Sequence, residues 1–553
     1  MKMKDFLKPS LWGKVMVCGC LLLGWSACSD DETTGGGSDN GTELPPISEA
    51  NMPERNPYLA AEHYSITHFN SAQSDAFPYS VKTGTFQADP DQCEGGWSGP
   101  VNLMTLSSTD PDYMWGMSSD RVSYIYVGDG SFTRLGEAAL PGVQTKTEDQ
   151  LKTLVADYSS VDELQAAVTS LLGANPQFAM ASGNYVLCDK DNYAYSNIGS
   201  TVVRYRLKNA ADPTQGIELD SQIKLSDYNP NIITLVGMVM TYDGHLVVVF
   251  GRGILILTRD LSTVMDYYQF PEGQQISNSV AVDEKGGIYV ASGSKTANGD
   301  GLMQKLVWTG SRLSADEADG AWQTTYDGGP QAPSIKMGMG TGSTPTLMGF
   351  GDDEDKLVVI TDGAKRMKLL AFWRDEIPAD APTPDPQNPR LAGQIEVGCG
   401  LPASTEWIQS EQSVAVAGYG AFVVNNLTST PGVGDKIVDV LAIGPLQTPP
   451  VGVERFQWNT AENAWESVWA RADVSSVSMI PAISTASNMV FVSGYSSTDG
   501  WDVEGLDWNT GATLHRVVLG KSSRGNGAYA IIQYMENGDL LFNSVCGAFR
   551  VKL

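Results

Sequence analysis

Histidine, cysteine and positive charge are scarce in this chain. Its 553 residues include four histidines and seven cysteines, and 36 lysines and arginines stand against 64 acidic residues, so the formal net charge is −28. Such a field repels phosphate backbones and excludes nucleic acid as a partner. It also disfavours a strongly anionic glycan unless a local basic pocket receives the charge.

The cysteines are too widely spaced for the common metal and redox motifs. Four of them lie beyond the N-terminal region and form no C-x-x-C pair: Cys93, Cys188, Cys399 and Cys546. Those at 188 and 546 lie in apolar, strand-like runs and are expected to be buried thiols, although an extracellular location would allow one or two disulfides. His63 and His68 are expected on one strand, on opposite faces.

The apolar run at the N-terminus is too short to span a bilayer. Residues 15–25 follow four lysines and lead into the sequence GWSAC, whereas a membrane helix needs about 20 apolar residues. The pattern resembles a bacterial lipoprotein signal, which implies a signal peptide over residues 1–28 that ends at a lipidated Cys28. Cys20 is an alternative lipidation site, and an ordinary secretory signal is the alternative to lipidation.

The next segment, residues 29–57, is rich in Asp, Gly, Ser and Pro and has no apolar periodicity. This composition predicts a flexible acidic tether. Its acidic cluster directly behind Cys28 resembles the surface-export tag of Bacteroidetes lipoproteins. The resemblance implies a location on the cell outer membrane, facing outwards, with membrane contact through the lipid anchor only.

One pattern repeats between residues 58 and 553. An apolar strand is followed by a polar turn, usually with glycine, and by a second strand of alternating β-branched and aromatic residues. Eight copies occur, at residues 113–128, 178–196, 236–250, 279–292, 346–361, 414–426, 479–494 and 530–544. A third strand with tryptophan or phenylalanine often follows, and such large side chains suit packing between neighbouring sheets.

These repeats predict an all-β fold, a single β-propeller. We expect eight blades, with seven as the alternative. The last repeat offers only three strands, so a strand near residues 63–69 is expected to close the ring. A helical insertion is expected at 147–173, because Thr147 with Gln150 and Ser160 with Glu163 form capping boxes. It would either cover the central funnel as a lid or lie at its edge.

The hairpins VAVDEKGGIYVAS and VMTYDGHLVVVF resemble those of NHL-type, gluconolactonase-type and quinoprotein-like propellers. These families include binding proteins, lactonases and cofactor enzymes, so the fold alone does not select a function. In gluconolactonase-like propellers an Asn just before this hairpin binds a divalent metal on the axis. The resemblance therefore makes Asn278 a candidate metal ligand, with a hairpin cap as the alternative.

Calcium is the one cofactor that the acidic turns suggest. Residues 188–193 (CDKDNY) and 351–356 (GDDEDK) bring carboxylates close together, and calcium takes six to eight oxygens. Neither run completes an EF-hand pattern, so solvated turns are the alternative.

Polar residues in loops that should line the mouth of the funnel are the candidate site. The catalytic candidates are Glu411, Arg366 and Asp362. The candidates for binding are Arg252, Asn278, Gln412, Arg524 and Asn526. Trp97 and Trp407 could stack on sugar rings.

Two functions follow from this sequence. The first is a surface-anchored propeller that binds an extracellular glycan, peptide or small molecule in its central funnel. The alternative is an extracellular enzyme that acts on a carbohydrate or lactone, assisted by a metal. The two differ in whether Arg252, Asn278, Arg366, Glu411 and Arg524 meet in one pocket.

Overall fold

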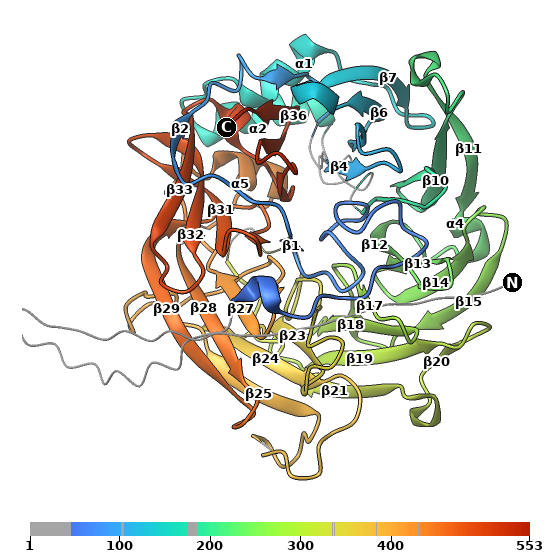
Figure 1. Ribbon diagram of the computed structural model, residues 1–553, viewed down its shortest axis with the longest axis vertical. Helices are drawn as coiled ribbons and strands as arrows, with labels where there is room; N and C mark the ends of the chain where they lie inside the picture. Colours follow the sequence, from blue (N-terminus) through green and yellow to red (C-terminus); the bar gives the residue numbers. More distant parts are fainter. Residues whose placement is uncertain are drawn as a thin grey trace, which may run out of the picture. The chain divides into compact units, whose positions relative to one another are not determined.

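The computed structural model describes residues 46–100, 104–173, 183, 185–333, 336, 338–382, 384–428 and 431–553, and in these ranges the strands form eight small sheets (Figure 1). The sheets stand around a central axis, each with its first strand near the axis and its last strand at the rim (Figure 1). The expected signal peptide, Cys28 and residues 29–45 of the tether lie outside the described residues.

The blades follow one another along the chain. Blade 1 contains β4 (Met104–Ser107), β5 (Tyr113–Met117), β6 (Arg121–Tyr126) and β7 (Thr133–Ala139). Blade 2 contains β8 (Leu187–Cys188), β9 (Ala194–Ile198), β10 (Thr201–Leu207) and β11 (Ile217–Lys224). Blade 3 contains β12 (Leu235–Met240), β13 (His245–Phe250), β14 (Gly253–Thr258) and β15 (Val264–Gln269).

Blade 4 is built from six strands: β16 (Gln274–Gln275), β17 (Ala281–Val282), β18 (Gly287–Ser294), β19 (Gly301–Trp308), β20 (Leu313–Ser314) and β21 (Trp322–Tyr326). Blade 5 contains β22 (Thr346–Met348), β23 (Leu357–Thr361), β24 (Lys368–Trp373) and β25 (Leu391–Glu396). Blade 6 contains β26 (Ala415–Ala417), β27 (Gly420–Val424), β28 (Val451–Asn459) and β29 (Ala464–Ser475).

The last two blades include strands from the N-terminal region. Blade 7 contains β30 (Ala482–Ser484), β31 (Met489–Ser496), β32 (Gly500–Asp507) and β33 (Thr513–Gly520), with β1 (Ala76–Phe77) inside and β2 (Gly84–Gln87) outside. Blade 8 contains β34 (Ile532–Tyr534), β35 (Leu540–Ser544), β36 (Gly547–Val551) and β3 (Glu94–Gly95).

The expectation of an eight-bladed propeller is confirmed, but the expected closing strand is wrong. The fourth strand of blade 8 is β3, which pairs antiparallel with β36 through Glu94 and Arg550. Blade 8 also packs on blade 1, because Leu541 and Ala548 share an apolar cluster with Met114 and Ile125. Residues 63–69 form no named strand in the structure and bond to the first strands of blades instead.

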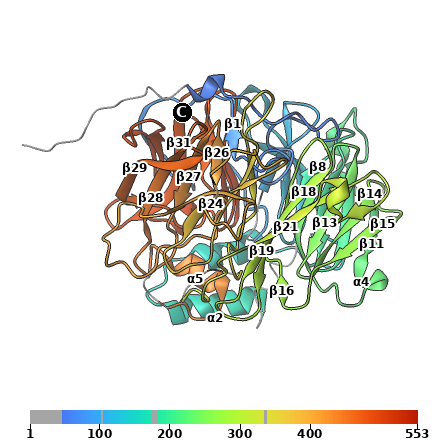
Figure 2. The ribbon, with the colours of Figure 1, turned by 90° about the horizontal axis from the view of Figure 1, so that it is seen from below.

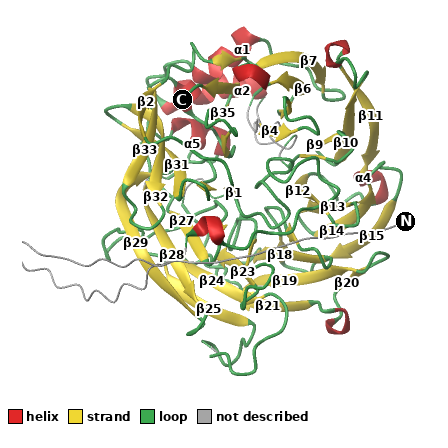
Figure 3. Cartoon of the chain, viewed as in Figure 1, coloured by secondary structure: helices red, strands yellow, loops and turns green. Residues whose placement is uncertain are grey.

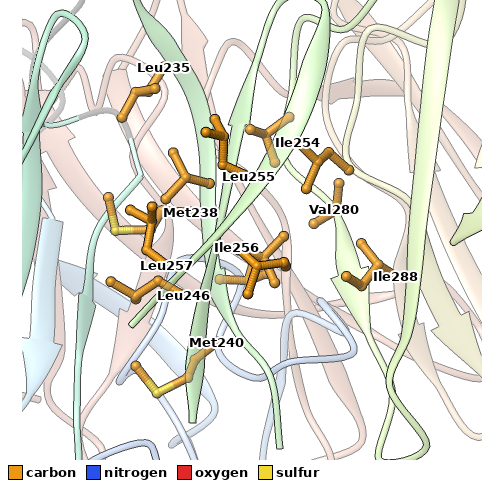
Figure 4. Close-up of a cluster of buried hydrophobic side chains, with 14 of the residues drawn as sticks. Leu235, Met238, Met240, Leu246, Ile254, Leu255, Ile256, Leu257, Val280 and Ile288 are labelled. Atoms are coloured by element: carbon orange, nitrogen blue, oxygen red, sulfur yellow. The ribbon is translucent and has the colours of Figure 1, made fainter. Parts of the chain in front are cut away.

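The blades are held together by apolar faces and by tryptophans of the third strands. Figure 4 shows part of the cluster that joins blades 2, 3 and 4. Trp308 of β19 donates from Nε1 to Asp243 Oδ2 in the first turn of blade 3, at 2.9 Å. Trp458 of β28 makes the same contact with Asp355 Oδ2 of blade 5, at 2.6 Å. The expected packing role of these tryptophans is therefore confirmed, and each also bonds to the neighbouring blade.

Seven of the eight expected hairpins pair the first two strands of a blade. The exception is 113–128, which forms β5 and β6, the second and third strands of blade 1. The first strand of that blade, β4 (MTLS), contains polar residues, so it does not match the apolar strand that begins the repeat pattern.

Residues 56–81, here called the plug, lie at the centre of the ring. They make a hydrogen bond to the first strand of every blade, or to the residue beside it. In the order of blades 1 to 8, the bonds are Ser107 N to Tyr64 O, Cys188 N to Ser65 O, Asn56 Nδ2 to Met240 O, Val282 N to Ser71 O, Leu347 N to Ala72 O, Val416 N to Ser74 O, Ile483 N to Asp75 O, and Tyr64 Oη to Tyr534 O. Residues 64–77 are all buried. The plug therefore ties all eight blades together.

The plug has a strained backbone and a buried contact between a histidine and an aspartate. Five of its non-glycine residues adopt positive φ angles: Tyr64, His68, Phe69, Gln73 and Asp75. Each such residue costs about 1 kcal/mol, and such conformations persist where the surroundings enforce them. His68 Nδ1 lies 2.9 Å from Asp75 Oδ2, and both side chains are almost fully buried.

Helices gather at one end of the ring and the plug at the other (Figure 2). The helical insertion forms α1 (Glu148–Lys152), η3 (Thr153–Val155) and α2 (Val161–Leu172), and it packs on α5 (Lys436–Ala442), which the sequence did not predict. The capping box at Thr147 and the cap at Ser160 are confirmed. We call the two ends the helix end and the plug end.

The remaining helical elements are short pieces in a mostly β structure (Figure 3). They are η1 (Ile47–Glu49), η2 (Gly128–Gly130), η4 (Pro213–Gln215), α4 (Leu225–Tyr228), η5 (Glu317–Asp319) and η6 (Ser523–Gly525). In the described ranges, each helix lacks the length or the apolar character needed to cross a bilayer. Cys93, Cys188, Cys399 and Cys546 are free thiols.

Candidate functional site

A buried lysine near the axis is the central feature of the helix end. Lys336 lies in the loop between β21 and β22, and 5% of its surface is exposed. Its Nζ donates to Gln409 Oε1 at 3.3 Å, and no carboxylate among the described residues comes within ion-pair distance of it. Burial lowers the pKa of Lys336 to about 8, against the opposing charges of Glu411 and Asp362. An amine in this setting is short of a partner for its positive charge.

The loop between β25 and β26 brings further polar groups beside the lysine. The Glu411 backbone N donates to Asn426 Oδ1 at 3.2 Å, and Gln412 Oε1 accepts from Ser476 Oγ at 3.4 Å. Gln412 is buried, and its Nε2 has no hydrogen-bond partner in the part of the chain that the structure describes. Gln412 therefore has a donor to offer.

Tyr529 enters the same region from the loop before β34. Burial and the neighbouring Glu411 carboxylate hold the pKa of Tyr529 well above its usual range, so the phenol is a neutral donor. We call Lys336, Gln409, Glu411, Gln412 and Tyr529 the axial cluster.

Asp362 lies at the edge of the axial cluster, in the turn between β23 and β24. It is 1% exposed and accepts hydrogen bonds from the backbone N of Lys368 at 2.8 Å and of Ala364 at 3.2 Å. Burial raises the pKa of Asp362 to about 6. Asp362 and Lys336 therefore both titrate closer to neutrality than such groups usually do.

Asn278 joins loops that lead to the axis. Its Nδ2 donates to Gly342 O, and its Oδ1 accepts from Thr344 Oγ1 and from Ser279 N, all at 2.9 Å. The oxygen that a metal would need is thus already bonded twice. In the described ranges no group of three or more His, Cys, Asp or Glu is placed to hold a metal.

Tyr185 connects this site to the plug. Its ring stacks on His68 with centroids 6.4 Å apart, and burial raises the pKa of its phenol to about 12 although the hydroxyl bonds to Thr344. A chain of contacts, Asn278 to Thr344 and Thr344 N to Ser413 Oγ, continues to the loop that carries Gln412.

The other expected site residues lie elsewhere. Arg524 donates to Pro90 O and Asp91, and its guanidinium covers the Trp97 ring at 4.5 Å. Arg366 bonds to Glu396 and to Thr405 O. The five residues whose meeting would favour an enzyme are therefore not brought into one pocket.

Two more expected binding residues stabilise neighbouring loops. Asn526 donates to Val440 O of α5 at 3.0 Å and accepts from Ala528 N. The backbone O of Arg252 accepts from Phe270 N, and its side chain lies near Tyr267 rather than the axis. The expected stacking residue Trp407 lies under Lys365, 5.2 Å from the ring centroid.

The two acidic turns proposed for calcium bond to cations of this chain. Asp189 and Asp191 both pair with Arg259 Nη1, at 3.1 and 2.9 Å. In the other turn, Lys356 Nζ donates to Gly351 O and Asp353 O. In both turns, therefore, a basic side chain of this protein bonds to oxygens that calcium would need as ligands.

A cleft of about 790 Å³ lies between blades 6 and 7. Both arginines that line it already pair with acids: Arg471 with Asp473, and Arg516 with Asp499 and Asp502. We therefore place the candidate site at the axial cluster, where Lys336 lacks such a partner.

Sequence reasoning missed Lys336, Gln409, Tyr185 and Tyr529. Lys336 directly precedes the glycine-rich loop that leads into the first strand of blade 5. This position is the sequence feature that could have identified it. Tyr185 lies in a run that reads as strand core, and Tyr529 lies at the end of a loop run from which Arg524 and Asn526 were selected instead.

The fold defines this protein as an eight-bladed β-propeller. No family model matches the chain. It is similar to an uncharacterized protein of Archaeoglobus fulgidus, 31% identical over 335 residues, which are 57% of this chain and 60% of that protein.

Among solved structures it resembles a europium-containing methanol dehydrogenase (10% identity, TM-score 0.47, covering 86% of this chain and 88% of that one). It also resembles a quinohemoprotein alcohol dehydrogenase from Pseudomonas putida (10%, 0.47, 87% and 75%). A third is BamB from Moraxella catarrhalis (11%, 0.36, 65% and 92%).

Proposed function

We propose that this protein is a propeller, lipid-anchored on the outer surface of the cell, that binds an acid-bearing sugar or similar small molecule at the axial cluster. The observation that carries the proposal is Lys336, a buried amine without a carboxylate partner among the described residues. A ligand carboxylate would supply the missing charge as a short, charge-assisted hydrogen bond.

The neighbours of Lys336 suit a polyhydroxylated ligand. Gln409 bonds to the amine, and Tyr529 offers a hydroxyl group beside Glu411. Gln412, in the same loop as Gln409 and Glu411, has a donor, Nε2, in need of an acceptor. A few such polar groups in a fixed frame are what orients a small ligand. The chain as a whole is acidic, so Lys336 is the local positive charge that an anionic ligand requires.

Calorimetry with the mature chain tests the proposal. We expect glucuronate to bind and glucose to bind far more weakly, and Lys336→Met to weaken glucuronate binding about tenfold or more. The matched control is Lys365→Met, which removes an exposed lysine of the same end of the ring that pairs with Glu406. Equal binding of glucuronate by the Lys336→Met protein would refute the site. Each titration is repeated with calcium, which the acidic turns suggested as a ligand.

The surface location rests on the N-terminal sequence alone. Antibody should label intact cells as strongly as permeabilised ones, and Cys28→Ala should move the protein from the membrane fraction to the soluble one. Label that requires permeabilisation would rule out surface display.

A second function, an enzyme acting on a carbohydrate or lactone, is favoured by one observation. Lys336 has a pKa of about 8 and Asp362 a pKa of about 6, and such paired shifts are common where protons are transferred. Incubation with gluconolactone and with uronate-containing glycans, followed by NMR, would detect products. Turnover that Asp362→Asn abolishes would establish that the protein is an enzyme. Binding without turnover would favour the binding function instead.

A further inference from the structure

A second pocket lies at the plug end of the ring, where blades 8 and 1 meet the plug. Its volume is about 380 Å³, in the range of small-molecule sites. The walls come from the plug, from β5 and from the turn between β34 and β35. A smaller cavity of about 230 Å³ shares Arg55, Ala61, Glu62 and His63 with it.

Aromatic side chains form much of this pocket. His63, Tyr64, Tyr79 and Tyr113 line it, together with Met114 and Met535. The Tyr79 ring lies 6.1 Å from that of His63, edge to face, and 6.1 Å from that of Tyr64. The faces of such rings attract positive charge.

Acidic side chains outnumber basic ones in the lining of the pocket. Glu62 and Glu536 both line it, and Arg55 is the cation at its rim. Burial raises the pKa of the Tyr79 phenol, and the charges of Glu536 and Glu62 raise it further, so both carboxylates act on this ring. Among the described residues that line this pocket, Arg55 is the one Lys or Arg.

His63 contributes a neutral hydrogen-bonding group. Burial lowers the pKa of His63, so the ring is uncharged at neutral pH. Its Nδ1 is buried and has no hydrogen-bond partner among the residues that the structure describes. A ligand hydroxyl could satisfy this nitrogen.

We propose that the plug-end pocket binds an organic cation, a small ligand with an ammonium group and a hydroxyl. The ammonium group lies against the Tyr79 and Tyr113 rings between Glu62 and Glu536, and the hydroxyl bonds to His63. Two carboxylates beside aromatic faces reject an anion and give a neutral sugar no charge to match. The ligand of this pocket thus differs in charge from the acid proposed for the helix end.

Choline and 3,3-dimethylbutan-1-ol test the charge directly, because they have the same shape and only choline is positive. We expect calorimetry of the mature chain to show choline binding about tenfold more tightly than the neutral alcohol. Equal affinities, no binding of choline, or binding of glucose alone would overturn the proposal. Sedimentation with phosphatidylcholine vesicles separates the sources: binding to vesicles as well as free choline assigns a lipid headgroup, and binding to free choline alone assigns a soluble amine.

Variants locate the site. Glu536 is exposed in its turn, so Glu536→Gln should fold normally and weaken choline binding several-fold. Tyr79→Leu keeps apolar bulk but removes the aromatic face, and should weaken it about tenfold. Glu284→Gln is the matched control, since Glu284 is an exposed acid in the corresponding turn of blade 4. Unchanged affinity in Glu536→Gln would refute the site even if Tyr79→Leu failed to fold.

Discussion

The two ends of the ring are built differently. At the plug end, residues 64–77 are buried and the plug bonds to all eight blades, in most cases through its backbone. At the helix end, the groups near the axis are side chains from loops, and Lys336 stands without an ion pair among the described residues.

This difference separates a structural centre from a candidate binding centre. Backbone bonds between the plug and the first strands satisfy polar groups that would otherwise be orphaned in the middle of the ring. A buried lysine does the opposite, since its desolvation opposes folding. We therefore expect substitutions at the plug end to destabilise the fold, and removal of Lys336 to stabilise it.

The largest effect is expected at Phe77, in β1 of the plug. Its side chain is fully buried and stacks against both Phe491 of blade 7 and Tyr534 of blade 8. Phe77→Ala should lower the free energy of unfolding by about 3–5 kcal/mol, through lost burial and the cavity left behind. Urea unfolding followed by tryptophan fluorescence measures the change.

The control for Phe77 is Leu514→Ala in β33 of the same blade, where the side chain is 37% exposed. It should change the free energy of unfolding by less than about 0.5 kcal/mol. A loss at Phe77 no larger than that of the control would mean that the plug does not hold the blades together.

Lys336→Met should act in the opposite direction. Its folded pKa of about 8 lies below the ordinary value of 10.5, so between these pH values the unfolded chain holds a proton that the folded chain has released. Stability of the wild type should therefore rise as the pH rises from 8 to 10.5 and be lower below pH 8 by about 3 kcal/mol. The variant should lack this slope and be more stable at pH 7.

Unfolding curves between pH 6.5 and 10.5 measure the slope for the wild type, for Lys336→Met and for Lys365→Met. The exposed Lys365 variant should keep the wild-type slope. If Lys336→Met destabilised the protein at pH 7, the lysine would be structural, and the contrast between the two ends would disappear.

Much of the fold could be predicted from the sequence because its signals are local. The hairpins combine period-two alternation with Asp and Gly in the turn, as in VAVDEKGGIYVAS, and both strands are close in sequence. The strand that closes blade 8 could not be found, because Glu94–Gly95 is two polar residues long and pairs with residues over 450 positions away. The sequence of the plug shows no apolar periodicity. Its bonds to the blades are made mainly by the backbone, which leaves no pattern of side chains to recognise.

The candidate site was only partly accessible for the same reason. Glu411, Gln412 and Asp362 could be proposed as polar residues of loops that enter first strands. Arg524 and Arg366 had the same kind of position but bond to nearby acids and carbonyls. What distinguishes Lys336 is burial without a charge partner, and that depends on loops of different blades meeting in space.

Substitution of Asn278 tests whether this part of the helix end stabilises the fold, as the plug does. Asn278→Ala removes three hydrogen bonds, to Gly342, Thr344 and Ser279, and should cost about 1–3 kcal/mol. Asn231→Ala, at an exposed position, is the control and should cost little. Thermal unfolding with and without calcium measures both proteins. A calcium-dependent gain in stability that Asn278→Ala abolishes would instead make this residue a metal ligand.

The smallest effect tests whether the helices act as a lid over the axial cluster. Ser160 caps α2 by accepting from the backbone N of Glu163, and Ser160→Ala should cost about 1 kcal/mol. Ser170→Ala, the same change at an exposed position within α2, is the control and should be close to neutral. If α2 lies only at the edge of the funnel, neither variant changes the rates of glucuronate binding and release measured by stopped flow. Faster release in Ser160→Ala alone would show that α2 closes over the ligand, since weakening its first turn would then open the helix end.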